Sequence, residues 1–242
     1  MKPINFKGFL FIAMLPLAAC SSSHSAEDNS SKKIEHIHEK QDDKWKLLIK
    51  DNSTEGWHSY LGDSVTGWQV EDGVLFTQGK NGDIVTDDVY ENFELRLDWK
   101  IEEGGNSGIF YHVIESPEYK RMHQTGPEFQ IIDNENYPAD LTEQQKTGAL
   151  SDVLAPTQAA AKPIGEWNHT QIVVNQGFVE HWLNDVKVLE YQLGSEQLKE
   201  QIAASKFAEL PYAKVQSGRI GLQDHGGPVY YKNIKIKVLK VL

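Results

Sequence analysis

A strict alternation of apolar and charged residues over Phe93–Ile101 constrains the fold of this chain more than any other feature. Five apolar side chains of one parity alternate there with Glu94, Arg96, Asp98 and Lys100. Successive side chains of a strand point to opposite faces, so the pattern predicts a strand with one buried face and one solvated face. The same alternation returns near the C-terminus, where Ile234, Ile236 and Val238 share a parity.

Further strands are expected at residues 68–70, 74–77, 109–114, 128–132, 170–175, 179–183, 186–191 and 219–223. Asn184 and Asp185 tolerate positive φ and predict a tight hairpin between two of these strands. A single helix is predicted over residues 196–205, with Ser195 as its N-cap. Many strands, no alternation with helices and a polar stretch at 134–162 predict an all-β sandwich with one short helix and a long loop insertion.

The N-terminal residues have the character of an export signal. Lys2 and Lys7 accompany an apolar stretch, residues 9–19, that is too short to span a bilayer. Its end, Leu17-Ala18-Ala19-Cys20, is typical of a bacterial lipoprotein signal; an ordinary signal peptide with a chance cysteine is the alternative. The expected organisation is a signal peptide at 1–19, a flexible tether at 20–44 and one domain at 45–242. We therefore expect a cell-envelope protein, anchored to the membrane by lipid on Cys20 and facing the periplasm or the surface.

Net charge and cysteine count argue against nucleic-acid binding, disulfide bonds and a cysteine-ligated metal. The chain has 35 acidic and 24 basic residues, a net charge of −11, which argues against binding to a phosphate backbone and so against nucleic acid. Its single cysteine excludes a disulfide framework and a cysteine-ligated metal.

Strand parity selects the polar side chains that share a face. On residues 128–132, Glu128 and Gln130 lie opposite the apolar Phe129 and Ile131. By the same parity, Ile220 and Leu222 point inward, whereas three polar residues project outward beside Gly221: Arg219, Gln223 and His225. These residue types donate and accept hydrogen bonds and exchange protons, which predicts a sugar groove with a glycine gap. A plain solvated face is the alternative.

Four further residues are weaker candidates for sugar binding: Asn106, Tyr111, His181 and Trp182. Asn106 also suits a simple turn. His181 shares its parity with Val179 and Leu183, so a packed core histidine remains an alternative. Trp182 can either stack on a sugar or cover the sheet.

Common catalytic motifs are absent from the sequence. It contains no G-x-S-x-G, H-E-x-x-H, Walker loop or post-strand G-x-G-x-x-G. Glu128 and Asp133 are five residues apart, which on one regular strand places them on opposite faces. The spacing therefore argues against a glycosidase that uses these two carboxylates as a pair.

An ordered set of motifs resembles the 3-keto-disaccharide hydrolase family: GNSGIFYH (105–112), EFQIID (128–133), GAL (148–150), GEWN (165–168), VEHWLN (179–184), SKF (205–207) and GRIGLQDHG (218–226). The resemblance covers residue 45 to the C-terminus. It implies a concanavalin-like jelly-roll sandwich and an exported enzyme that acts on glycosides oxidised to a ketone at carbon 3. Three positions depart from the family pattern: Ser151, Asp185 and Lys232.

The implied substrate suggests a reaction. A ketone at carbon 3 acidifies the hydrogen on carbon 2, so a base can start an elimination that expels the group on carbon 1 before water adds. The resemblance implies Glu128 or His225 as base or acid, with Arg219 and Gln223 holding the oxygens. No cofactor is required, although a divalent ion that polarises the ketone is compatible with these residues. A non-catalytic carbohydrate-binding module, with Trp182 and Tyr111 as stacking platforms, and a conventional glycosidase are the rival hypotheses.

Overall fold

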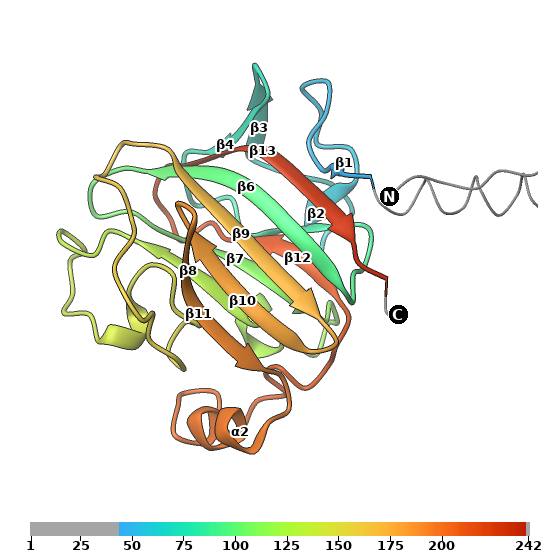
Figure 1. Cartoon of the computed structure of the whole chain (residues 1–242). Helices are drawn as coiled ribbons and strands as arrows, with labels where there is room; N and C mark the ends of the chain where they lie inside the picture. The colour runs from blue at the N-terminus through green and yellow to red at the C-terminus, as the bar shows by residue number, and fades with distance from the viewer. Residues whose placement is uncertain (1–43, 241–242) are drawn as a thin grey trace, which may run out of the picture. The chain divides into compact units, whose positions relative to one another are not determined.

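Two antiparallel sheets contain the strands of residues 44–240, the part of the chain that the computed structural model describes (Figure 1). The eight-stranded sheet has the order β11-β10-β9-β6-β13-β4-β3, with β1 beside β13, and the five-stranded sheet has the order β2-β5-β12-β7-β8. The larger sheet contains β1 (Lys46–Leu47), β3 (Trp68–Glu71), β4 (Val74–Thr77), β6 (Phe93–Ile101), β9 (Asn168–Asn175), β10 (Phe178–Leu183), β11 (Val186–Gln192) and β13 (Val229–Val238). The smaller contains β2 (Trp57–Ser59), β5 (Ile84–Thr86), β7 (Asn106–Val113), β8 (Glu128–Ile132) and β12 (Arg219–Leu222).

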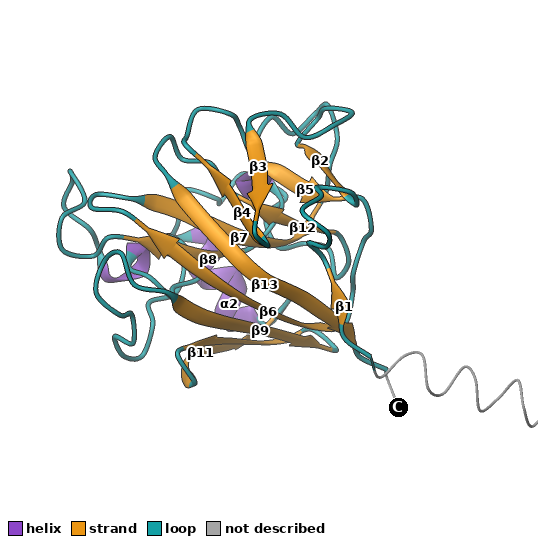
Figure 2. Cartoon of the chain, turned by 90° about the horizontal axis from the view of Figure 1, so that it is seen from above, coloured by secondary structure: helices purple, strands orange, loops and turns teal. Residues whose placement is uncertain are grey.

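The core lies between the two sheets, which face one another in Figure 2. Burial on β6 alternates residue by residue, as its sequence predicts, and its apolar side chains are at most 2% exposed. They form one cluster with apolar residues of the smaller sheet: Ile109, Phe129, Ile131, Ile220 and Leu222. Each such buried side chain contributes about 1.5–3 kcal/mol through the hydrophobic effect. The predicted all-β, jelly-roll type of sandwich is confirmed.

The predicted hairpin turn and the predicted helix N-cap are confirmed as well. Asn184 and Asp185 adopt φ values of 50° and 65° in the turn between β10 and β11. The helix, α2 (Glu196–Ala203), begins where Ser195 accepts a hydrogen bond from the backbone N–H of Leu198. It buries Leu198 against the core.

Three short strands were not predicted: β1, β2 and β5. They contain two or three residues each, too few to show a period. All three residues of β5 are buried, so the strand shows no apolar–polar alternation. Asn106, expected in a turn, begins β7.

The segment 134–162 contains no strand and only one short helical turn, η2 (Glu143–Gln145). It is fastened to β8, since Thr147 Oγ1 accepts a hydrogen bond from the backbone N–H of Ile132 and donates one to its carbonyl oxygen. The insertion therefore borders the outer strand of the smaller sheet.

The signal peptide, Cys20 and all but the last residue of the expected tether lie outside residues 44–240. Within that range, no helix has the length and apolar character needed to cross a bilayer.

Candidate active site

A pocket of about 490 Å³ lies on the face of the five-stranded sheet that is turned away from the core. Five predicted site residues line it together: Glu128 and Gln130 from β8, Asn106 from β7, and Gln223 and His225 from the segment after β12. Their parity explains this arrangement, because Phe129, Ile131, Ile220 and Leu222 are all buried on the opposite face. The volume is in the range of small-ligand sites.

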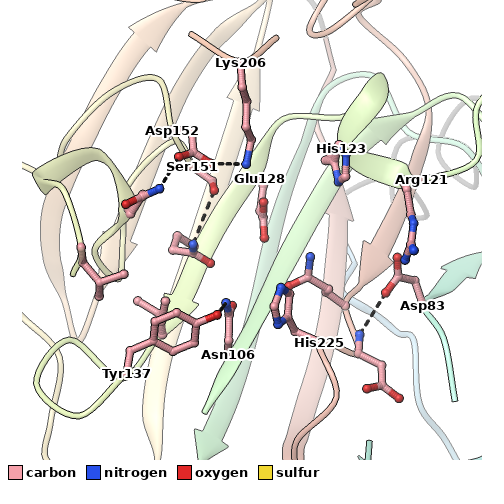
Figure 3. Close-up of a pocket in the computed structure, with 16 residues that line it drawn as sticks. Asp83, Asn106, Arg121, His123, Glu128, Tyr137, Ser151, Asp152, Lys206 and His225 are labelled. Carbon is pink, nitrogen blue, oxygen red and sulfur yellow. Dashed lines mark hydrogen bonds and ion pairs between the residues drawn. The ribbon is translucent and has the colours of Figure 1, made fainter. Parts of the chain in front are cut away.

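The walls of the pocket come largely from segments outside the strands (Figure 3). Asp83 precedes β5, Arg121 and His123 belong to the segment around η1 (Met122–Gln124), Asp152 lies in the insertion and Lys206 follows α2. None of these five was predicted as a site residue. Lys206 stands within the motif SKF, and the stretch Lys120-Arg121-Met122-His123 is unusually basic for this acidic chain, so both offered a weak signal.

Glu128 is a buried carboxyl at the centre of this pocket. It is 6% exposed, and burial raises the pKa of its carboxyl to about 8. The charge of Lys206 and a hydrogen bond from Ser151 lower this pKa, while the negative charges of Asp152 and Asp83 raise it further. A group that titrates near neutral pH suits proton transfer.

Asp83 is a second carboxyl of the pocket with a shifted pKa. Burial raises its pKa to about 6, opposed by a hydrogen bond from the backbone N–H of Asp224 and by the charge of Arg121. In Figure 3 the Arg121 guanidinium is directed towards this carboxyl. The spacing of Glu128 and Asp133 argues only against a pair on one strand, whereas Asp83 reaches the same pocket as Glu128 from another segment.

Asp133 itself has a structural role. Its carboxylate accepts hydrogen bonds from the backbone N–H groups of Gly104, Glu135 and Asn136 at 2.9–3.0 Å. Burial alone would raise its pKa, but these bonds outweigh burial and lower it. It is not among the residues that line the pocket with Glu128, as parity predicted.

Arg219, which was predicted to hold substrate, does not line the pocket. Its Nε lies 2.9 Å from Oε2 of Glu115, and its Nη1 donates to the carbonyl oxygens of Thr86 and Asp87. The predicted open space at Gly221 is absent too, because an added Cβ there would lie 2.4 Å from Sδ of Met122. Met122 therefore covers the strand next to Arg219.

Tyr111 and His181 are core residues, which corrects their prediction as sugar contacts. Both are 0% exposed, and the Tyr111 hydroxyl lies 2.9 Å from Nε2 of His181. Burial lowers the pKa of His181 to about 4, so the ring is neutral at physiological pH. The alternative of a packed core histidine is the one that the structure supports.

For Trp182 the structure supports the second of its two alternatives, in which it covers a sheet. It lies on β10 of the eight-stranded sheet, with the Lys187 ammonium 5.8 Å from its ring centroid. Because the pocket is on the smaller sheet, Trp182 covers the other sheet and is not one of the pocket's residues.

Two amide oxygens of the pocket lack a partner within the described chain: Asn106 Oδ1 and Gln223 Oε1. Both are buried, and a buried acceptor without a donor is costly. Sugar hydroxyl groups are donors of the right kind for them.

Residues 44–240 contain no group of three or more His, Cys, Asp or Glu side chains that could hold a metal ion. The predicted independence from cofactors stays a prediction, which activity after dialysis against a chelator tests.

A β-sandwich whose polar pocket contains a buried carboxyl with a raised pKa fits the class of carbohydrate-active enzymes. Residues 44–237 match the model of the 3-keto-alpha-glucoside-1,2-lyase-like domain. The chain belongs to this family.

Relatives agree with this assignment. A protein of Bacteroides thetaiotaomicron named 3-keto-disaccharide hydrolase is 35% identical over 226 residues, a match that covers 80% of this chain and 78% of the relative. A solved structure of a candidate glycosyl hydrolase from Parabacteroides distasonis is 40% identical with a TM-score of 0.78, covering 84% of this chain and 97% of that one. A second from the same organism is 32% identical with a TM-score of 0.64, covering 81% and 100%. These relatives support a glycoside-cleaving function.

Proposed function

We propose that the domain cleaves glycosides whose sugar carries a ketone at carbon 3, by deprotonation at carbon 2, elimination and hydration. The observation that carries the proposal is Glu128, a buried carboxyl with a pKa raised to about 8 at the centre of a polar pocket. The Bacteroides relative, named for a 3-keto disaccharide, supports the choice of substrate.

The chemistry needs only a few protein groups. A base takes the carbon 2 proton, and the electron pair left behind forms an enolate with the carbon 3 ketone. Collapse of the enolate breaks the bond from carbon 1 to the leaving oxygen, which takes a proton from an acid. Water then adds at carbon 1 and a proton returns to carbon 2, so the net reaction is hydrolysis.

The pocket supplies side chains for each task. Glu128 on β8 and His225 in the segment after β12 are proton-transfer candidates, and Arg121 is the cationic donor for the ketone oxygen in place of Arg219. Asn106 and Gln223 contribute unpartnered amide oxygens for sugar hydroxyl groups. Donors aimed at a developing oxyanion accelerate such reactions by about 10²–10³.

A conventional glycosidase is the second candidate, because two carboxyls with raised pKa values, Glu128 and Asp83, line one pocket. Such an enzyme uses one carboxyl as acid and the other as base or nucleophile on an unoxidised sugar.

Turnover of a 3-keto disaccharide and of its unoxidised parent, each in heavy water, tests these functions together. Elimination and hydration place deuterium at carbon 2 of the product, whereas displacement at carbon 1 leaves carbon 2 unlabelled. Cleavage of the parent sugar without label identifies a conventional glycosidase. Binding without turnover of either sugar identifies a carbohydrate-binding module.

We further propose that the protein is exported and anchored in the cell envelope through lipid on Cys20. The support is the sequence Leu17-Ala18-Ala19-Cys20 after a short apolar stretch. An anchored hydrolase acts on sugars outside the cytoplasm.

A further inference from the structure

Four carboxyls line the pocket, and two of them are fully engaged in structure. Asp224 accepts hydrogen bonds on both oxygens, from the backbone N–H groups of Lys80, Asn81 and Gly226 and from the Thr77 hydroxyl, at 2.7–3.2 Å. Asp152 forms an ion pair with Lys206 through one oxygen and accepts a hydrogen bond from Gln145 through the other. Both oxygens of each are therefore already bonded within the protein.

Asp83 differs from these two. Only its Oδ1 accepts a hydrogen bond within the described chain, from the backbone N–H of Asp224 at 3.0 Å. Its Oδ2 accepts no hydrogen bond within the described chain and is the oxygen available to a ligand, beside the Arg121 guanidinium that is directed towards this carboxyl (Figure 3). Its negative charge also raises the pKa of Glu128, so the two carboxyls interact electrostatically across the pocket.

We propose that Asp83 is the second proton-transfer group of this site, the base that removes the carbon 2 proton, and that Glu128 is the acid that protonates the leaving oxygen. The assignment rests on the proposed 3-keto glycoside chemistry and adds a residue and a division of roles to it. Asp83 reaches the pocket from the segment before β5, separately from the β8 strand that carries Glu128. An acid and a base on different segments can address two different atoms of one sugar.

The order of the two pKa values supports this division. Around Asp83 the charged neighbours are Arg121 and Asp224, and its pKa is about 6; around Glu128 they are Lys206, Asp152 and Asp83, and its pKa is about 8. At a pH between these values Asp83 is ionised and Glu128 is protonated, which are the states that the proposed base and acid require. The exchanged roles would require the opposite protonation states.

The protons balance over one turnover. Asp83 takes the proton from carbon 2, and Glu128 gives its proton to the oxygen that leaves carbon 1. Ionised Glu128 next takes a proton from water as the hydroxide adds to carbon 1. The proton on Asp83 exchanges with solvent during this time, so protonated Asp83 gives a solvent-derived proton to carbon 2. Both carboxyls end the cycle as they began it.

The test separates the base step from the acid step. A 3-keto sugar without a leaving group at carbon 1, 3-keto-1,5-anhydroglucitol, exchanges its carbon 2 hydrogen with heavy water if the base works, and the exchange is followed by proton NMR. Cleavage of a 3-keto disaccharide needs base and acid together. Both rates are measured for wild type, Asp83→Asn, Glu128→Gln and His225→Ala. The control is Asp88→Asn, the same change at an exposed carboxyl that is ion-paired with Lys46.

We expect Asp83→Asn to lose exchange and cleavage alike, each by about 10² or more. Glu128→Gln is expected to keep exchange and lose cleavage, and Asp88→Asn to keep both. Exchange at the wild-type rate in Asp83→Asn would overturn the inference. It would also be overturned if His225→Ala lost exchange while Asp83→Asn retained it. If wild type neither exchanges the ketone nor cleaves it, the proposed function fails instead. Circular dichroism of each variant shows that it is folded.

Discussion

The carboxyl of Glu128 lies directly over Gly108 of the neighbouring strand. A Cβ added to Gly108 would be 2.0 Å from Oε1 of Glu128, far inside van der Waals contact. In the β7–β8 register, Gly108 is paired with Gln130 and Phe110 is paired with Glu128. The Glu128 side chain therefore extends along β7 into a space that exists only because residue 108 has no side chain.

Replacing this glycine is expected to displace the carboxyl. We expect Gly108→Ala to lower turnover by about 10², because proton transfer requires the acid within hydrogen-bond reach of its target. The crowding should also cost about 1–3 kcal/mol of unfolding free energy. Gly227→Ala is the control, since an added Cβ there meets no atom within 4 Å. Wild-type turnover in Gly108→Ala would show that the orientation of Glu128 is unimportant.

Burial of Glu128 predicts a pH-dependent stability. Its pKa rises from 4.5 to about 8 on folding, so between these values unfolding releases a proton and the free energy of unfolding falls as pH rises. Below pH 4.5 both states are protonated and the effect is absent. Thermal melts at pH 5 and pH 9 should therefore show Glu128→Gln gaining stability relative to wild type at the higher pH. Glu209→Gln, at an exposed position, is the control. A constant difference between Glu128→Gln and wild type would contradict the shifted pKa.

Arg219 is expected to stabilise the fold without touching substrate. Arg219→Met removes the ion pair with Glu115 and the hydrogen bonds to two carbonyl groups, which should cost about 1–3 kcal/mol of unfolding free energy. The kcat per folded molecule should stay close to wild type. Urea unfolding and initial rates measure the two effects. A fall in kcat of about 10² with unchanged stability would return Arg219 to the active site.

Lipid anchorage should be separable from catalysis. We expect Cys20→Ser to move the protein from the membrane fraction to the soluble fraction and to leave the activity of the domain unchanged. Fractionation after a high-salt wash, with the same assay on both fractions, measures this. A variant that remains in the washed membranes would refute anchorage through Cys20.

Strand parity is a local property, and it therefore predicted which residues of β8 form the floor of the pocket, the part carried by the sheet. Glu128 and Gln130 face away from Phe129 and Ile131 whatever the rest of the chain does. Arg219 shares the parity argument, but a register shift between Arg219 and Gly221 and the side chain of Met122 separate it from the pocket. Neither feature is visible in the strand's own sequence.

The walls of the pocket were not predictable in the same way. Asp83, Arg121 and Lys206 lie in segments without a hydrophobic period, and only the tertiary structure brings them to one cavity. For His181 the sequence left two alternatives open. Strand parity correctly allowed a position in the core, but the residue type also suggested a role in the site. The structure shows that His181 is a core residue, because its ring is buried between the Tyr111 hydroxyl and the carbonyl oxygen of Gly148.

The separation of a sheet-borne floor from loop-borne walls has an evolutionary consequence. Insertions and deletions in surface segments leave strand register intact, so loops tolerate them far better than the sheet does. We therefore expect changes in the length of the 134–162 segment to reshape one wall of the pocket while the contact between Glu128 and Gly108 stays in place.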